Sequence, residues 1–153
     1  MSQLLDTFRR GIGLALVGLA FAVSAEAGPP PASVTGTWLT PGGDGVIAIE
    51  PCGDALCGRI VGITRAPGEP MPTDVRGVSQ CGLTIIDNEH PADDGAWLGH
   101  VTDPRTGDTY GAKLWIDADG NLRMRGFLGL PLLGQTQIWH PYTGRLTQSC
   151  GFA

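Results

Sequence analysis

The stretch AKLWIDADGNLRMRG, residues 112–126, decides the fold because it reads as two strands joined by a tight turn. A three-residue loop ending at Gly120 would place that glycine in the left-handed conformation that closes such a hairpin. This register sets Ile116 opposite Leu122, whereas a two-residue turn would set it opposite Arg123 and mix the two faces. The stretch therefore predicts a hairpin with one wholly apolar face.

The segment DPRTGD, residues 103–108, predicts a second hairpin immediately before the first. Pro104 favours a type I turn, and Gly107 suits the left-handed position that follows it. Both hairpins then share one inner face, which carries Trp97, Gly99, Val101, Tyr110, Ala112, Leu114, Met124 and Gly126. Because two turns give the same interior independently, we expect an antiparallel meander with a dry inner side.

The rest of the chain extends this pattern with short β-type segments and no helical period after Gly28. One long irregular connection, 64–81, contains three prolines. Many short strands separated by turn residues predict an all-β sandwich or barrel. The expected strands are 36–40, 44–50, 56–63, 82–86, 96–102, 109–117, 121–127 and 134–140.

The N-terminal residues have the pattern of a secretory signal peptide. Arg9 and Arg10 precede an apolar stretch, 11–23, which is too short to span a bilayer as a helix. A small-x-small site then ends at Ala27. We therefore expect a periplasmic or secreted protein without a transmembrane anchor. Its parts would be a signal peptide over 1–27, a Pro-rich lead-in over 28–35 and one β-domain over 36–153.

The charge of the chain argues against nucleic acid and anionic lipid as partners. The formal net charge is −5, and Lys113 is the single lysine of the sequence. A mildly acidic surface does not attract phosphate groups.

The four cysteines all follow the signal peptide, and an even number in an exported chain favours two disulfides. Cys52 and Cys57 flank an expected turn at 54–55, which leaves Cys81 to pair with Cys150. The short C-x2-C spacing of a zinc site is absent from the sequence. We therefore predict no metal site.

No catalytic signature stands out. The three histidines, His90, His100 and His140, are scattered, and the serines lie in no nucleophile motif. The run DADGN resembles a calcium loop, but its glycine is fourth and its twelfth position is Leu128. The sequence therefore predicts a protein that is not an enzyme and that has no cofactor.

The expected inner face offers two interpretations, a solid core or a pocket for a small apolar or amphipathic ligand. Aromatic residues commonly fill cores, but small residues on the same face would leave space, and an eight-stranded barrel is just wide enough for either outcome. Gln137 and Trp139 would join this face if the last strand pairs accordingly. The candidate ligand-binding residues are Trp97, Gly99, Tyr110, Ala112, Leu114, Met124, Gln137 and Trp139.

The segment LGLPLL, residues 128–133, connects the last two expected strands. Pro131 argues against a strand there. The segment could fold over the barrel end as a lid, which we favour, or remain exposed as a contact for a protein partner. The second case supports an alternative function, a protein-binding module or inhibitor of an envelope enzyme. Close by, Arg123 would lie on Trp115 as a cation–π pair.

Four stretches together resemble a known bacterial family. They are GTW at 36–38, EPCGDALCGRIVG at 50–62, the W-x-G-x-V-x-D-P-x-T-G-x-x-Y-x-A-K-L pattern at 97–114 and the L-x-x-R-G-F-L-G-L-P-L-L-G-Q-T-Q-I-W pattern at 122–139. This order is similar to the family called domain of unknown function 2147. The resemblance implies an exported, antiparallel up-and-down eight-stranded lipocalin-like β-barrel with no agreed activity. It also implies that Trp38, in a Gly-x-Trp triplet like that of lipocalins, plugs one barrel end.

Overall fold

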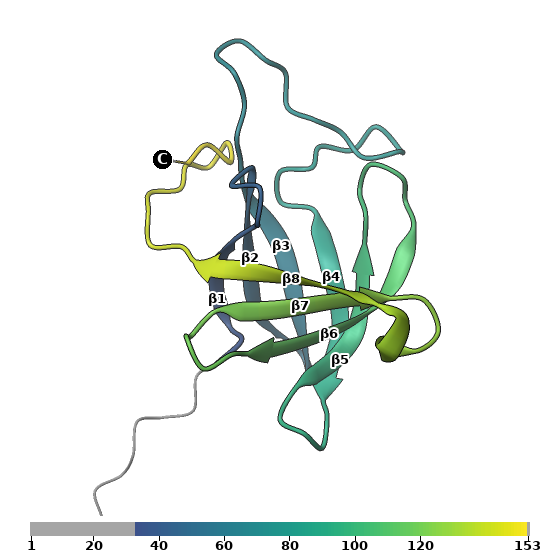
Figure 1. Ribbon diagram of the computed structural model, residues 1–153. Coiled ribbons are helices and arrows are strands. Elements are labelled where there is room, and N and C mark those ends of the chain that lie inside the picture. The colour runs from purple at the N-terminus through teal and green to yellow at the C-terminus, as the bar shows by residue number, and fades with distance from the viewer. Residues whose placement is uncertain (1–32, 153) are drawn as a thin grey trace, which may run out of the picture. The chain divides into compact units, whose positions relative to one another are not determined.

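Eight antiparallel strands close into one barrel in chain order, as Figure 1 shows. This computed structural model describes residues 33–152, with the side chain of residue 88 excepted. The predicted signal peptide and most of the lead-in lie outside these residues. The elements are β1 (Gly36–Leu39), β2 (Gly45–Cys52), β3 (Ala55–Ile63), β4 (Thr84–Pro91), β5 (Trp97–Thr102), β6 (Thr109–Ile116), β7 (Leu122–Phe127), the 3-10 helix η1 (Pro131–Leu133) and β8 (Gln135–Pro141).

The register of the two decisive hairpins is confirmed. Ile116 pairs with Leu122, and Gly120 closes the β6–β7 turn with a φ of +81°. In the β5–β6 hairpin, Trp97 pairs with Leu114. The alternation of apolar and polar residues thus determines which side of each strand is buried.

The observed strand ends differ from the predicted ones by one or two residues in most places, and the β2–β3 turn and β4 show the differences that matter. The β2–β3 turn is Gly53–Asp54, one residue earlier than expected, so Cys52 pairs with Ala55. β4 begins at Thr84 rather than at residue 82 and continues to Pro91. Its last residues favour turns. They remain in the strand because a bulge between Asp87 and His90 shifts the pairing register with β5.

Both disulfides are present, with the pairing that the sequence favours. Cys52 is joined to Cys57 diagonally across the β2–β3 hairpin, with a Cα–Cα distance of 5.8 Å. Cys81 is joined to Cys150 with a Cα–Cα distance of 5.7 Å. The second bridge holds the C-terminal segment beside β3, where the Ile63 N–H donates to the Cys150 carbonyl at 2.7 Å.

One end of the barrel interior is filled by apolar side chains. Trp38 and Trp139 belong to a single buried cluster that also includes Val34 and Leu122. The Trp38 indole N–H donates to the Val34 carbonyl at 2.9 Å, which fixes the segment before β1 against the ring. The polar atom of this buried ring is therefore satisfied.

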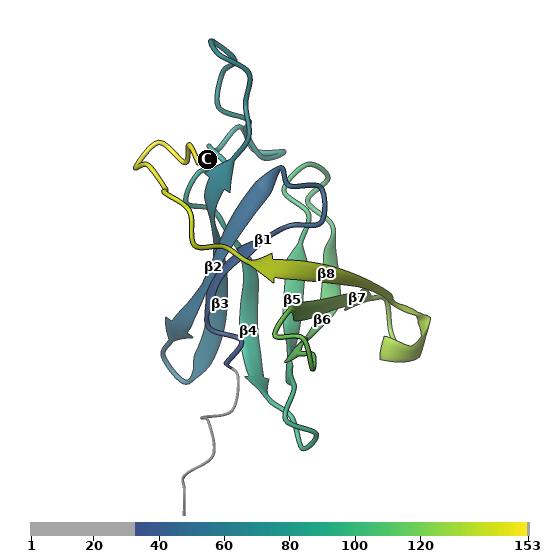
Figure 2. The ribbon, with the colours of Figure 1, turned by 60° about the vertical axis from the view of Figure 1, so that its left-hand side comes forward.

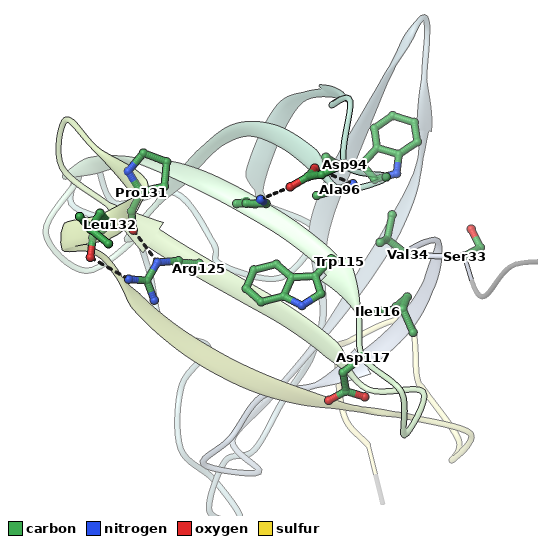
Figure 3. A pocket seen from close by; sticks show the side chains of 13 residues that line it. Ser33, Val34, Asp94, Ala96, Trp115, Ile116, Asp117, Arg125, Pro131 and Leu132 are labelled. Atoms are coloured by element: carbon green, nitrogen blue, oxygen red, sulfur yellow. Dashed lines mark hydrogen bonds and ion pairs between the residues drawn. The ribbon is translucent and has the colours of Figure 1, made fainter.

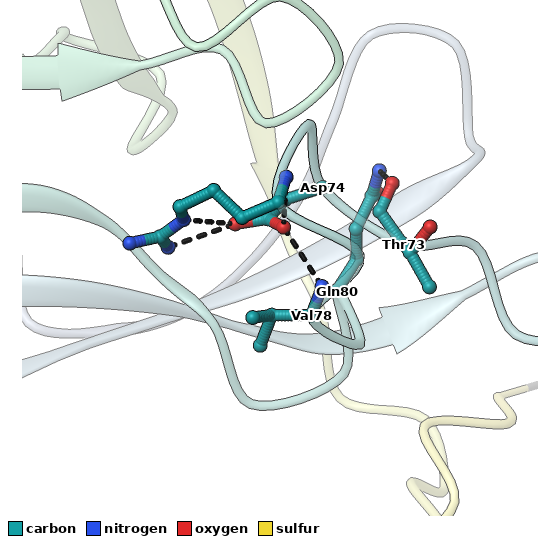
Figure 4. A network of polar contacts seen from close by, with 5 residues as sticks. Thr73, Asp74, Val78 and Gln80 are labelled. Atoms are coloured by element: carbon teal, nitrogen blue, oxygen red, sulfur yellow. Dashed lines mark hydrogen bonds and ion pairs between the residues drawn. The ribbon is translucent and has the colours of Figure 1, made fainter.

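The long β3–β4 connection is ordered by one carboxylate, shown in Figure 4. Asp74 accepts hydrogen bonds at 2.9 Å from the backbone N–H groups of Arg76 and Val78, and it pairs with the Arg76 side chain at 2.8 Å. The hydrogen bond from the Val78 backbone is the main cause that holds the pKa of Asp74 below its usual value.

None of the helices formed by residues 33–152 is long and apolar enough to cross a bilayer.

Candidate functional site

The strand register places all eight predicted ligand-binding residues on the inner face of β5 to β8. The β7–β8 pairing decides the position that the sequence left open, because Leu122 lies opposite Trp139 and Met124 opposite Gln137. The buried members are Ala112, Leu114, Met124 and Trp139; the half-buried ones are Trp97, Gly99 and Tyr110, while Gln137 is exposed.

The inner wall changes along its length from packed to open. Leu114 is fully buried, whereas Gln135 and Gln137 face inward by register and yet are exposed. A Cβ atom built on Gly126 would meet a single neighbour, Val101 Cγ1, at 3.9 Å. The inner wall is therefore loosely packed at Gly126, which is half-buried.

Glu89 is an inward-facing residue that the sequence analysis missed. The residue lies in the β4 bulge, where residues 88–89 stand opposite Gly99 of β5, and it pairs with the buried Leu56 of β3. The stretch around it reads as a turn because it combines Asp, Asn and Pro, and the bulge removes the alternation that marks a strand. No sequence signal therefore identified it.

The carboxyl group of Glu89 is fully buried and unpaired. Its exposed fraction is 0%, and neither of its oxygens has a hydrogen-bond partner. Burial, assisted by the negative charge of Asp87, raises the pKa of Glu89 to about 8. The group is consequently protonated at neutral pH.

A cavity, called the outer cavity here, is lined by the outward-facing side chains of Lys113, Trp115 and Arg125 together with the β4–β5 turn and the inward-facing Trp97 and Ile116. The cavity has a volume of about 710 Å³ and extends from Val34 to Leu132. Figure 3 shows the Trp115 ring between Arg125 at one end and Ile116 at the other. Of the eight predicted ligand-binding residues, only Trp97 lines this cavity.

Most of the charges in and beside this outer cavity are neutralised within the protein. Lys113 forms an ion pair with Asp94, and Arg123 pairs with Asp117 at 2.6 Å. The predicted stacking of Arg123 on Trp115 is wrong, because the ammonium of Lys113 lies over that ring, 5.9 Å from its centroid. Lys113 and Arg123 are therefore held in internal salt bridges and do not form a free anion site.

The leucine loop, residues 128–133, is exposed and does not cover the barrel end. Leu132 is 85% exposed and Leu128 is 69% exposed; Figure 2 shows the segment between β7 and β8 projecting from the barrel wall. Arg125, which points outward, donates to the Leu132 carbonyl at 3.1 Å and to Thr136 Oγ1 at 2.7 Å. It also donates to the Pro131 carbonyl. The lid prediction is wrong, because Arg125 holds the loop on the outside.

The barrel has the fold of a solved lipocalin. The structure titled "Protein HP1028 from the human pathogen Helicobacter pylori belongs to the lipocalin family" matches with a TM-score of 0.62 and 13% sequence identity. The match covers 73% of this chain and 84% of that chain. A search of curated proteins finds no match to the sequence.

The sequence itself matches a bacterial family across all eight strands. The family is described as "Uncharacterized protein conserved in bacteria (DUF2147)", and the matched segment is residues 36–141. This segment begins with the first residue of β1 and ends with the last residue of β8. It includes Glu89, the inner wall and the leucine loop. The chain belongs to this family of uncharacterized bacterial proteins, DUF2147, and has a lipocalin-like barrel.

Proposed function

We propose that the protein binds a small apolar or amphipathic molecule inside its barrel. The observation that carries this proposal is the loose packing of the inner wall at Gly126, beside the inward-facing but exposed Gln135 and Gln137. Binding sites for small molecules are concave and mainly apolar, with few polar groups that orient the ligand. Tyr110 and Gln137 supply such groups next to Ala112, Leu114 and Met124.

We propose that the protein binds its ligand outside the cytoplasm, in the periplasm or after secretion. Two disulfides join all four cysteines, and disulfides persist in oxidising compartments such as the periplasm. The predicted signal peptide, residues 1–27, would deliver the chain there. Trp38 would close the packed end of the barrel, so the ligand would enter near Gln135.

Binding of the neutral fluorescent probe N-phenyl-1-naphthylamine tests the site directly. Gly126→Leu adds an apolar side chain to the inner wall at a position where a Cβ atom has space, and it should weaken probe binding at least tenfold while the protein stays folded. Trp115→Phe changes the outer cavity alone and serves as the matched control. We expect its probe affinity to stay within about twofold of the wild type.

Two outcomes would contradict the proposal. Loss of binding in Trp115→Phe with full binding in Gly126→Leu would move the ligand to the outer cavity. A wild-type protein that binds no apolar probe would show that the barrel interior is closed to ligands. Native mass spectrometry of protein purified from the periplasm would then identify natural cargo as an added mass that Gly126→Leu lacks.

A second candidate function, protein binding, is favoured by the leucine loop. Four leucines there are exposed: Leu128, Leu130, Leu132 and Leu133. Exposed apolar residues grouped in this way mark contact surfaces. The hydrogen bonds from Arg125 hold the loop in one conformation, which lowers the entropy that a partner must remove on binding.

The test is a variant in which Leu130 and Leu132 are both changed to Ser. We expect a periplasmic protein to be retained by the wild type, to be lost with this variant, and to bind the purified wild type in a defined stoichiometry. Val75→Ser combined with Val78→Ser, which alters exposed valines in the β3–β4 connection, is the control. Equal retention by all three proteins would refute a role for the loop.

A further inference from the structure

Glu89 is a buried acid with no partner in the barrel interior. Leu56 of β3 pairs with it, and Gly99 of β5 faces the bulge that contains it. Both carboxyl oxygens are buried and without hydrogen bonds. Buried polar groups in folded proteins almost always have a partner, and one without a partner calls for an explanation.

The interior supplies no positive charge for this acid. By register, Tyr110 is the one other ionisable side chain among the inward-facing positions of the described strands, whose remaining members are apolar residues, glycines and glutamines. The charge that acts on Glu89 is that of Asp87 on the same strand, and it has the same sign. A cation that pairs with the ionised form of Glu89 would therefore come from outside the protein.

We propose that Glu89 anchors the ligand of the barrel, and that this ligand is an amphipathic amine. Its ammonium group would pair with the Glu89 carboxylate, while its apolar chain would lie along Met124, Ala112 and Gly126. This inference rests on the proposed function, because it identifies the chemical class of the molecule bound in the same interior.

The amine satisfies the interior better than other amphipathic molecules of similar length. An ammonium group donates up to three hydrogen bonds to a carboxylate, which has two acceptor oxygens. An alcohol would supply one weaker hydrogen bond, and a fatty acid would bring a second carboxyl group beside Glu89. The net charge of −5 also attracts cations towards the protein.

Proton release gives the proposal a quantitative signature. Because burial raises the pKa of Glu89 to about 8, the free protein holds a proton there at neutral pH. An ammonium ligand must displace this proton. Its affinity should therefore increase as the pH is raised towards about 8, by up to tenfold per pH unit. The affinity of an uncharged ligand should not change with pH.

The experiment compares decylamine, decanol and decanoate by isothermal titration calorimetry at about pH 6 and pH 7. We expect the wild type to bind decylamine at least tenfold more tightly than decanol, and to release close to one proton per amine in two buffers of different ionisation enthalpy. Glu89→Gln should bind decylamine and decanol equally. The control, Glu50→Gln, removes an exposed carboxylate paired with Arg59 on the outer face and should retain the preference.

The outcomes separate this inference from the function on which it rests. Binding of decanol or decanoate with no preference for decylamine would overturn the amine anchor and leave the ligand-binding barrel intact. A preference that persists in Glu89→Gln would also overturn it. If none of the three molecules binds to the wild type, the proposed function itself is wrong. The proton release is measured on the wild type, so the test does not depend on the folding of the variant.

Discussion

At the scale of single residues, Glu89 links stability to pH. Its folded-state pKa of about 8 lies above the ordinary value of 4.5, so between these values the folded protein holds a proton that the unfolded chain has released. The contribution of protonated Glu89 to the stability of the fold is complete below about pH 4.5. This contribution is lost as the pH rises through about 8. The free energy of unfolding should fall by at most about 1.4 kcal/mol per pH unit in this window.

Urea unfolding at several pH values between about 5 and 8.5 measures this effect, and Glu89→Gln should remove it. The amide keeps the shape of the side chain but does not titrate. If the wild type and the variant lose stability in parallel as the pH rises, Glu89 is not the group responsible.

Arg125 is a second residue with an effect beyond its own position. Its three hydrogen bonds reach Pro131, Leu132 and Thr136. Arg125→Met should increase hydrogen exchange at least tenfold at the Leu133 amide while changing global stability by less than about 1 kcal/mol, as is usual for surface substitutions. Arg105→Met, which breaks a surface ion pair in the β5–β6 turn, should leave that amide unchanged.

At the scale of elements, turn chemistry and alternation predicted both decisive hairpins correctly. They failed for β4, because Asp87 to Pro91 reads as a turn and becomes a strand through pairing with β3 and β5. The side to which the leucine loop folds was equally unpredictable. The side depends on hydrogen bonds from Arg125 to backbone carbonyl groups. Every residue has such a carbonyl, so the sequence does not indicate which ones are used. The sequence thus predicted the residues of the inner wall that β5 to β8 contribute. It did not predict that Glu89 of β4 faces the same interior.

The β3–β4 connection should respond to acid through Asp74. Because the pKa of Asp74 is lowered, the carboxylate stabilises the loop above its ordinary value of 3.8, and this contribution is lost as the pH falls through the lowered value. NMR titration of the Arg76 and Val78 amide protons, which donate to Asp74, should give a midpoint below 3.8. A midpoint above 3.8 would contradict this role, and Asp74→Asn should abolish the transition.

At the scale of the whole molecule, the two disulfides should differ in their contribution to stability. The Cys81–Cys150 bridge spans 69 residues and the Cys52–Cys57 bridge spans 5. In the chain-entropy model, these spans correspond to about 4 and about 2 kcal/mol. Thermal unfolding of the two double Cys→Ser variants tests this order. A larger loss on removal of the short bridge would show that native-state contacts, rather than chain entropy, dominate.

The barrel is closed by a short seam. β1 and β8 share two residue pairs, Trp38 with Pro141 and Leu39 with His140, whereas β6 and β7 share six. Thermal fluctuations that open the barrel will therefore part β1 from β8 first. The parted strands would present unpaired backbone groups of the kind that recruit strands from other chains and start aggregation. Conditions or substitutions that loosen this seam should thus favour self-association before the core around Trp139 is lost.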